Sequence, residues 1–358
     1  MSDPSLPAPH TDPTPIFEHF RGSYGTELLT VAVTRYDLFD RLASAPRRLP
    51  ELATALDLAM RPAVVLTTAL RAMGLLQTDA GGRMSPTAIA GEHLVRGGAF
   101  YVGDYVGLAA EAPGVVAMAE RLRTNRPAGA SSSSDAAAGD EVGDGTAFIY
   151  RAGTTSAMEA EASARRLTLA LAGRAKNVAP AAAERLQPGA ARTLLDLGGG
   201  TGIYSIAAVR RHPGLRAVVF DRPEVLKVAA EMSAAYGTED RVELVAGDMF
   251  VDDLPRADLV LLSNVLHDWD VPECERLLRR AAEAARAGGR VLVHDVFLND
   301  ALDGPLPIAL YSAALFTLTE GRAYSGAEYR GMLTAAGLRP GKLAPTAVHC
   351  GLLEGAKP

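Results

Sequence analysis

The stretch from Thr193 to Gly202 places the strongest constraint on how this chain can fold. It reads TLLDLGGGTG, a short apolar run with one aspartate, followed by four glycines within five positions. An apolar run of this length that ends in glycines is typical of a buried parallel strand. The glycines permit positive φ and let a ligand approach the backbone closely. Because open α/β sheets bind ligands at the carboxyl ends of their strands, this turn is the first candidate site.

Strand and helix patterns alternate from this turn onward. The predicted strands span residues 193–197, 215–220, 241–246, 257–262 and 289–296, and helical patterns lie between them. Such alternation predicts a parallel, doubly wound α/β sheet. A predicted catalytic domain over residues 187–358 is completed by helices at 307–318 and 325–336 and by closing strands at 341–343 and 348–355.

The N-terminal half is predicted to be mostly helical. Apolar residues recur at helical spacing over 16–42, 47–58 and 61–76, and a short hairpin turns at Gly81–Gly82. Helices followed by a two-stranded wing outline a winged-helix domain, which we place at residues 16–110. Linker helices follow over 111–186, with a loop at 127–145 whose Ser, Ala, Gly and Asp content predicts flexibility. The first 15 residues hold five prolines and predict a disordered tail.

Composition narrows the possible partners. The formal net charge of −6 argues against a surface that binds nucleic acid. The third helix of the winged-helix pattern has few polar residues to meet phosphates: Arg61, Thr67, Thr68 and Arg71. No apolar run approaches the roughly 18 residues of a membrane span. The two cysteines, Cys274 and Cys350, lie far apart, so we expect a cytoplasmic protein without disulfides.

Two acidic residues indicate which kind of adenosine-containing cofactor the glycine turn binds. Asp221 ends the second strand about twenty residues after the first glycine, a position suited to a pair of ribose hydroxyls. Asp196 precedes the glycines, where its charge would repel the pyrophosphate of a dinucleotide. The same charge suits a cofactor that carries ammonium and sulfonium groups. The pattern therefore favours S-adenosylmethionine over NAD.

The segment from Gly247 to Phe250 closes the third strand and adds weaker support. Asp248 can accept a hydrogen bond from an adenine amino group, and Met249 and Phe250 offer soft and aromatic surface to the ring. Because a Gly-Asp turn after a strand is common, the value of this segment lies in its spacing from Asp196 and Asp221.

The motifs taken together resemble those of a known family. LLDLGGGTG, FDRPEV, RVELVAGDMF, SNVLHDW and GGRVLVHDVFLND, in this order, are similar to the class I S-adenosylmethionine-dependent O-methyltransferases of the caffeate and acetylserotonin type. The resemblance covers essentially the whole chain, since those enzymes also carry an N-terminal winged-helix dimerisation domain. It implies S-adenosylmethionine as cofactor, a homodimer, and a Rossmann-like seven-stranded sheet whose last strand is antiparallel.

In that family the histidine of the HDW motif is the general base, which here is His267. A neutral imidazole can take the proton of a hydroxyl as its oxygen attacks the methyl carbon. The family frames this histidine with two acidic residues. One aligns with Asp295, and the other is expected at Ala323, where this chain departs from the pattern. Either Asp295 alone orients His267, or the reaction does not need a finely tuned base.

The glycine turn and the resemblance together predict the residues around the ligands. The predicted cofactor residues are Asp196, Gly198, Gly200, Asp221, Asp248, Met249, Phe250 and Ser263. Apolar character alone predicts the substrate-facing residues Phe148, Tyr150, Met158, Tyr311, Phe316 and Tyr324. Trp269 packs either beside the adenine or in the core. No metal site is predicted, because strand alternation directs His294 and Asp295 to opposite faces.

We therefore predict a homodimeric S-adenosylmethionine-dependent O-methyltransferase acting on a small, aromatic, hydroxylated metabolite. The departure at Ala323 leaves two alternatives open. One is methylation of carbon or nitrogen in the same fold, and the other is a cofactor-binding relative that catalyses hydroxylation, decarboxylation or rearrangement. A winged-helix regulator that senses the cofactor is disfavoured by the small positive charge of its third helix.

Overall fold

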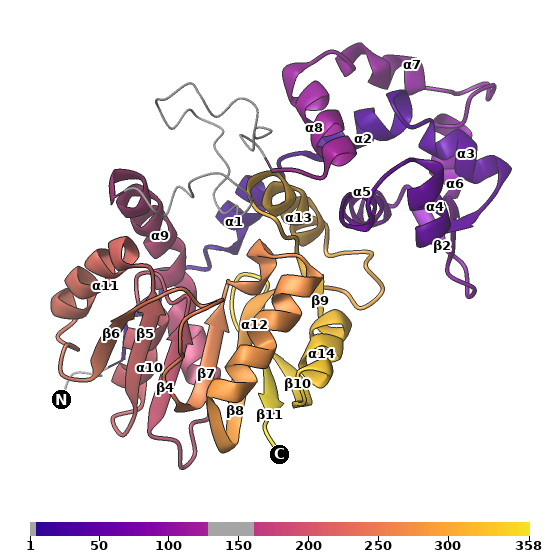
Figure 1. Ribbon diagram of the computed structural model, residues 1–358. Coiled ribbons are helices and arrows are strands. Elements are labelled where there is room, and N and C mark those ends of the chain that lie inside the picture. The colour runs from indigo at the N-terminus through magenta and orange to yellow at the C-terminus, as the bar shows by residue number, and fades with distance from the viewer. Residues whose placement is uncertain (1–4, 128–160) are drawn as a thin grey trace.

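The computed structural model describes residues 5–127 and 161–358, with side chains from residue 164 onward in the second range. A mostly helical N-terminal part adjoins a C-terminal part built on one large sheet, and helix α13 (Leu306–Leu318) lies between them (Figure 1). Apart from its first residue, the predicted loop at 127–145 lies outside the described residues. So do three predicted substrate residues, Phe148, Tyr150 and Met158.

The C-terminal sheet confirms the predicted doubly wound α/β fold. Its strands are β4 (Thr193–Leu197), β5 (Arg216–Asp221), β6 (Val242–Ala246), β7 (Ala257–Ser263), β8 (Ala285–Leu298), β9 (Tyr324–Ser325), β10 (Arg339–Pro345) and β11 (Cys350–Ala356). Their order is β10-β11-β8-β7-β4-β5-β6, with β9 paired to β8. Strands β4 to β8 are parallel, whereas β11 runs antiparallel to both β8 and β10. The short β9 makes the sheet eight-stranded, because Tyr324 and Ser325 pair with Phe297 and Leu298 at the end of β8.

Helices cover both faces of this sheet, because alternate strand residues point to opposite sides. On one face Leu194 and Val219 pack against α9 (Glu161–Arg185), α10 (Ile203–Arg211) and α11 (Pro223–Ala235). On the other face Leu195 and Val293 pack against α12 (Val271–Ala284) and α14 (Gly326–Ala335). A largely parallel sheet is expected to be buried in this way. The predicted strand at 193–197 coincides with β4, and α10 falls where a helical pattern is predicted between the first two strands.

The N-terminal part contains more and shorter elements than the sequence predicts. They are α1 (Thr14–Arg21), α2 (Gly25–Thr34), α3 (Leu38–Ser44), β1 (Arg47–Arg48), α4 (Leu49–Ala55), α5 (Met60–Ala72), β2 (Leu76–Thr78), β3 (Arg83–Pro86), α6 (Ala88–His93), α7 (Gly103–Val106), η1 (Gly107–Ala109) and α8 (Pro113–Thr124). Three helices replace the continuous one predicted over 16–42, because Tyr24 (φ 73°) and Asp37 (φ 45°) are left-handed. The predicted hairpin is β2–β3, and β1 adds a third strand.

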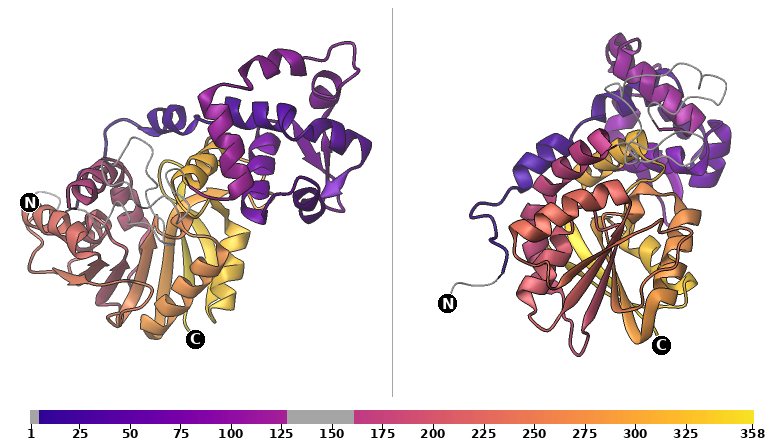
Figure 2. Two further views of the ribbon diagram at one scale, coloured as in Figure 1. Left: turned by 45° about the horizontal axis from the view of Figure 1, so that its top comes forward. Right: turned by 60° about the vertical axis from the view of Figure 1, so that its left-hand side comes forward.

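Helix α13 belongs to the packing of both parts. Its residues Leu310, Ala313 and Phe316 lie in the N-terminal hydrophobic core, and α1 runs alongside it (Figures 1 and 2). Arg61 of α5 strengthens this junction, because it donates hydrogen bonds to Thr319 O (3.1 Å) and Gly321 O (3.3 Å) just after α13. The two parts are thus joined by apolar packing and by a buried cation.

Three of the four polar residues of α5 lie inside the molecule, and the fourth, Arg71, is half-buried and donates to the carbonyl of Ala301. Arg61, Thr67 and Thr68 are at most 5% exposed, so the helix that would read DNA in a winged-helix regulator does not present these residues to solvent. Among the described residues, no single helix is long and apolar enough to cross a membrane. Helices α4 and α5 meet that test only when taken together, as a pair bent by 111°.

Of the predicted tail, residues 5–13 precede α1 and are not helical, whereas Thr14 and Pro15 form the first turn of α1. Leu6 within it is 5% exposed and packs with Ala175 and Ala179 of α9. This leucine therefore attaches the segment to the C-terminal part.

Candidate functional site

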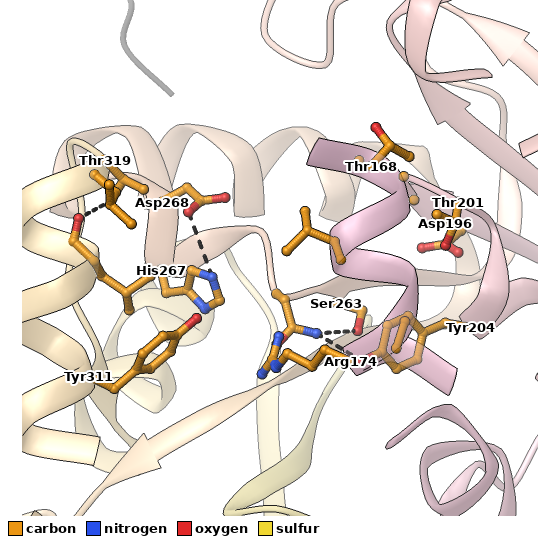
Figure 3. Close-up of a pocket in the computed structure, with 18 residues that line it drawn as sticks. Thr168, Arg174, Asp196, Thr201, Tyr204, Ser263, His267, Asp268, Tyr311 and Thr319 are labelled. Atoms are coloured by element: carbon orange, nitrogen blue, oxygen red, sulfur yellow. Dashed lines mark hydrogen bonds and ion pairs between the residues drawn. The ribbon is translucent and has the colours of Figure 1, made fainter. Parts of the chain in front are cut away.

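A cavity of about 200 Å³ lies at the carboxyl ends of the parallel strands, bounded by α9, α13 and the turn after β4 (Figure 3). It is lined by Thr168, Leu171, Arg174, Ala175, Asp196, Gly198, Gly199, Gly200, Thr201, Tyr204, Ser263, Asn264, His267, Asp268, Tyr311, Leu315, Leu318 and Thr319. The glycine turn, the predicted base and one predicted substrate residue therefore share a single cavity.

At two positions of the glycine turn a side chain would collide with neighbouring atoms. Because the residues are glycines, a ligand can approach the backbone of the turn. Gly198 has a φ of +71°, and a Cβ at this position would lie 2.9 Å from Cγ2 of Val265. A Cβ at Gly199 would lie 2.8 Å from the carboxyl carbon of Asp196. The N–H of Gly198 donates to the carbonyl of Phe220 at 2.9 Å, which fixes the turn against β5. The glycines are required by geometry.

Asp196 presents one carboxylate oxygen that the protein leaves without a partner. Its Oδ2 accepts a hydrogen bond from Ser205 Oγ at 2.7 Å, whereas the buried Oδ1 has no hydrogen-bond partner among the described residues. Burial raises the pKa of Asp196 to about 7, although the Ser205 hydroxyl opposes this shift. A cationic group placed at Oδ1 would satisfy it and stabilise the ionised form. The ammonium group of S-adenosylmethionine fits this requirement.

Asp221 is held at the end of β5 by two backbone donors. Gly200 N donates to its Oδ2 at 2.8 Å, and Arg222 N donates to its Oδ1 at 2.7 Å. Each carboxylate oxygen keeps a further lone pair, so the group can accept from a ribose hydroxyl pair. Asp221 does not line the cavity itself, but its bond to Gly200 ties it to the turn.

Asp248, Met249 and Phe250 follow β6 and lie outside the lining of the cavity. The N–H of Phe250 donates to Asp248 Oδ1 at 2.8 Å, and Asp248 Oδ2 lies 3.2 Å from the Arg222 guanidinium. The Met249 sulfur would lie 3.7 Å from a Cβ at Gly198, so this segment borders the turn. Phe250 meets Trp269 edge to face, with ring centroids 4.7 Å apart, in the hydrophobic core beside α12.

Ser263 takes part in a chain of polar side chains along one wall of the cavity. Its hydroxyl contacts His294 Nδ1 at 2.9 Å and accepts from Asn264 Nδ2 at 3.1 Å. Asn264 Nδ2 also donates to the Tyr204 hydroxyl at 3.1 Å. Burial lowers the pKa of His294 to about 4, so this imidazole is neutral at physiological pH. Ser263 and Asn264 line the cavity, and these hydrogen bonds fix their orientation. Figure 3 shows Ser263 and Tyr204 on this wall.

His267 and Asp295 form a buried pair at the ends of adjacent strands. His267 lies in η2 (Leu266–Asp268), directly after β7, and its Nδ1 is 2.5 Å from Asp295 Oδ1 at the end of β8. Val296 N and the Tyr329 hydroxyl also donate to Asp295, at 2.8 and 3.1 Å. Nδ1–H of His267 thus faces a carboxylate, and Nε2 keeps its lone pair for a proton from a ligand.

The pair shifts the titration of both groups. Burial lowers the pKa of His267, but the charges of Asp295 and Asp268 and the hydrogen bond to Asp295 together outweigh burial, and the pKa of the imidazole is raised overall. Burial raises the pKa of Asp295, and the interaction with His267 reverses this and lowers it overall. The carboxylate therefore stays ionised and the imidazole is a stronger base than a free histidine.

The acidic residue that the family pattern expects at Ala323 is absent, and another carboxyl stands beside the imidazole. Ala323 is fully buried, and its N–H donates to Ser312 Oγ at 3.1 Å. Asp268 Oδ1 lies 3.6 Å from His267 Nε2. Burial raises the pKa of Asp268 to about 7, so this group is partly protonated near neutral pH.

Of the predicted substrate residues within the described part of the chain, Tyr311 alone lines the cavity. Its ring meets that of His267 edge on, with centroids 6.1 Å apart. Phe316 is fully buried in the N-terminal core, where the Arg61 guanidinium lies 4.8 Å above its ring. Tyr324 is also fully buried, and its hydroxyl donates to the carbonyl of Trp269 at 2.7 Å. Apolar character cannot separate a pocket wall from a core, because both bury aromatic rings.

Sequence reasoning missed the contribution of α9. Thr168, Leu171, Arg174 and Ala175 of this helix form one side of the cavity. The available signal was the charge of Arg174, which falls at helical spacing between Leu171 and Val178. A charged residue on such a stripe is unusual enough to indicate a site.

A doubly wound sheet that carries this glycine turn and this buried histidine is that of an S-adenosylmethionine-dependent methyltransferase. Residues 146–339 match the O-methyltransferase domain family. The 3-hydroxy-5-methyl-1-naphthoate 3-O-methyltransferase of Streptomyces sahachiroi is 34% identical over 339 residues, which cover 94% of this chain and 92% of that protein. The chain belongs to this O-methyltransferase family.

Further relatives and solved structures are also similar to this chain. Bovine acetylserotonin O-methyltransferase is 44% identical over 146 residues, 41% of this chain and 42% of that protein. The crystal structure of an O-methyltransferase family 2 protein from Planctomyces limnophilus in complex with apigenin is 46% identical. It has a TM-score of 0.87 and covers 100% of this chain and 99% of its own. Human N-acetylserotonin methyltransferase in complex with S-adenosylmethionine shares the fold, with a TM-score of 0.58 at 23% identity over 96% of each chain.

Proposed function

We propose that this O-methyltransferase acts on a hydroxyl group of a small aromatic metabolite, with His267 as the general base. The observation that carries the proposal is the 2.5 Å contact between His267 Nδ1 and Asp295, which turns Nε2 toward the cavity, where Asp268 Oδ1 lies 3.6 Å from it. A phenolic proton is acidic enough for an imidazole to accept it as the oxygen attacks.

In this proposal the cofactor supplies a methyl group on a sulfonium centre. Nε2 of His267 would take the hydroxyl proton while the oxygen bonds to the methyl carbon and the methyl–sulfur bond breaks, with S-adenosylhomocysteine as the leaving group. Asp295 would stabilise the imidazolium that results. Asp196 receives the ammonium group, and Asp221 receives the ribose hydroxyls. Asp248, Met249 and Phe250 surround the adenine, and Ser263 with Gly198 and Gly200 completes the wall. Holding both reactants in line contributes a large further part of the rate.

The aromatic character of the substrate has two kinds of support. The relative at 34% identity is named for methylation of a hydroxynaphthoate, and the structure at 46% identity is a complex with apigenin. In this chain Tyr311, Leu315 and Leu318 give the cavity an apolar side next to His267. Such a surface suits a planar ring.

A homodimer built on the N-terminal part is also proposed. Apolar side chains of this part are widely exposed in the single chain, among them Tyr105 (78%), Leu108 (81%) and Phe100 (63%). Exposed apolar side chains gathered in one region mark interaction surfaces. A reducing cytoplasm is the compartment we propose, on the ground that Cys274 and Cys350 are both unpaired.

Replacement of His267 tests the proposed reaction. With a phenolic acceptor such as 2-naphthol, the native protein is expected to form methyl ether and S-adenosylhomocysteine in equal amounts, measured by mass spectrometry. His267→Ala should lower the rate by about 10²- to 10⁴-fold, the usual contribution of a general base. His10→Ala, which removes an exposed histidine, is the control. Product without S-adenosylhomocysteine would favour a different reaction, and an unchanged rate in His267→Ala would remove the base from the proposal.

A further inference from the structure

Arg174 places a positive charge in the cavity on the side of the predicted base. It projects from α9, and its charge acts on His267, Tyr311 and Asp295. Figure 3 shows its side chain in the cavity together with His267, Tyr311 and Ser263. A guanidinium in this position faces whatever lies beside the acceptor hydroxyl.

The guanidinium has no carboxylate partner among the described residues. Within the described part of the chain, its Nε is buried without a hydrogen-bond partner, and its Nη2 contacts Cys350 Sγ at 3.5 Å. A cysteine sulfur is a weak acceptor. The nearby Asp295 is occupied, because His267, Val296 and Tyr329 donate to its two oxygens. Leaving the buried Nε donor unpaired is costly unless a ligand supplies an acceptor.

A second arginine adds to this positive charge. Arg21 of α1 is 2% exposed and lies 4.8 Å above the ring of Tyr311. Its Nη1 donates to the carbonyl of Val348 at 3.0 Å, while its buried Nη2 has no partner among the described residues. Burial lowers the pKa of Arg21, and the neighbouring charge of Arg174 lowers it further. The charges of Arg21 and Arg174 both act on Tyr311, so both would stabilise an anion bound beside this ring.

We propose that Arg174 binds a carboxylate carried by the methyl acceptor itself, so that the substrate class is hydroxylated aromatic acids rather than neutral phenols. The inference rests on the proposed function in one respect, namely that the acceptor hydroxyl faces His267. A planar carboxylate matches the paired N–H donors of a guanidinium. With the hydroxyl at Nε2 of His267 and the acid at Arg174, the aromatic ring lies along Tyr311.

The carboxylate of the cofactor is the other possible source of the anion, and the sheet order argues against it. Arg174 touches Cys350 at the start of β11, and β11 is three strands away from β4, which carries Asp196. That separation is about 14 Å. The ammonium and carboxylate of the cofactor share one carbon, so they bridge at most about 9 Å, counting one hydrogen bond at each end. The strand order therefore favours a ligand other than the cofactor carboxylate at the Arg174 contact with β11, and weaker binding of S-adenosylhomocysteine by Arg174→Gln would show the opposite.

The test compares two ligands that differ only in the acid. 3-Hydroxy-1-naphthoate and 2-naphthol share the ring system and the hydroxyl. Their binding to the full chain saturated with S-adenosylhomocysteine is measured by calorimetry. The native protein should bind the acid about 10- to 100-fold more tightly, as expected for hydrogen bonds to a charged group. Arg174→Gln should abolish this preference while changing the affinity for 2-naphthol by less than about twofold, and Arg174→Lys should retain part of it.

The controls separate this inference from its alternatives. Lys176→Gln removes a positive charge from the exposed side of the same helix and should leave both affinities unchanged. The inference is overturned if the native protein does not prefer the acid, which needs no variant to be folded. It is equally overturned if Arg174→Gln weakens S-adenosylhomocysteine instead of the acid. Because the readout is binding, an acid that binds with this preference but is not methylated would contradict the proposed function and leave the anion site intact.

Discussion

At the scale of single residues, the buried pair of His267 and Asp295 couples the rate of reaction to pH. A base must be neutral to accept a proton, and the carboxylate raises the pKa of the imidazole. As pH falls through that raised pKa, the imidazole becomes charged and its capacity to accept a proton is lost. The acid limb of kcat/KM should therefore lie above the ordinary histidine value of about 6.5.

Asp295→Asn should separate the two effects of the carboxylate. Loss of the charge lets the pKa of His267 fall, so the acid limb moves to lower pH. Loss of the charge also weakens the hydrogen bond that His267 Nδ1–H donates to residue 295, so the imidazole is less well oriented. The rate at the pH plateau should therefore fall by about 10²-fold. The measurement is kcat/KM for a phenolic acceptor between pH 5 and 9. If the plateau value of kcat/KM fell but the acid limb stayed at the same pH, Asp295 would orient His267 without changing its pKa.

Asp196 makes binding of the cofactor depend on pH in the same range. Its pKa of about 7 means that the carboxyl is largely neutral below neutrality. An ammonium group requires the ionised form, so affinity for S-adenosylhomocysteine should weaken by up to about tenfold for each pH unit below 7. Calorimetry from pH 5.5 to 8 checks this. Asp196→Asn should bind weakly and independently of pH, whereas Asp268→Asn should keep the pH dependence if Asp196 is its source.

At the scale of the structural element, the stability of the turn after β4 and its affinity for the cofactor depend on glycine at position 199. Gly199→Ala would place a Cβ 2.8 Å from the carboxyl carbon of Asp196 and 2.9 Å from Cγ1 of the buried Val219. The overpacked turn should lose about 1–3 kcal/mol of stability in denaturant unfolding. Because Asp196 is displaced, affinity for S-adenosylhomocysteine should fall by at least about tenfold.

Gly173→Ala is the matched control for that substitution. A Cβ at Gly173 on α9 meets nothing within 4 Å, and alanine favours a helix over glycine by about 1 kcal/mol. This variant should be as stable as the native protein or more so, with unchanged cofactor affinity. If Gly199→Ala and Gly173→Ala lost equal affinity for S-adenosylhomocysteine, the loss would not be due to an added side chain in the turn.

At the scale of the whole molecule, the exposed apolar residues of α7 and η1 predict the oligomeric state. Tyr105→Asp combined with Leu108→Asp should convert a dimer into monomers, because two charges would be buried at the proposed interface. Light scattering coupled to gel filtration measures the mass. Val251→Asp changes an apolar residue that is 65% exposed on the C-terminal part, and this control should stay dimeric. A native protein that is monomeric at micromolar concentration would refute the proposal.

The C-terminal fold and much of its site were predictable from local pattern. The apolar runs of β4 to β8 alternate with amphipathic helices, and parallel strands present their carboxyl ends at one edge. That rule alone brings Asp196, Ser263 and the pair of His267 and Asp295 to the same edge. The doubly wound topology followed for the same reason, and only the short β9 was missed.

What the sequence determined by itself was the sheet, the glycine turn and the order of the motifs along the strands, because each depends on residues close together in the chain. What only the tertiary structure decided was the composition of the cavity wall. It separates Tyr311, which faces His267, from Phe316, which lies in the N-terminal core. It also brings Arg174 of α9 into the cavity from a helix that sequence reasoning had assigned to a linker. Such placements follow from how helices pack across distant parts of the chain, which no local pattern encodes.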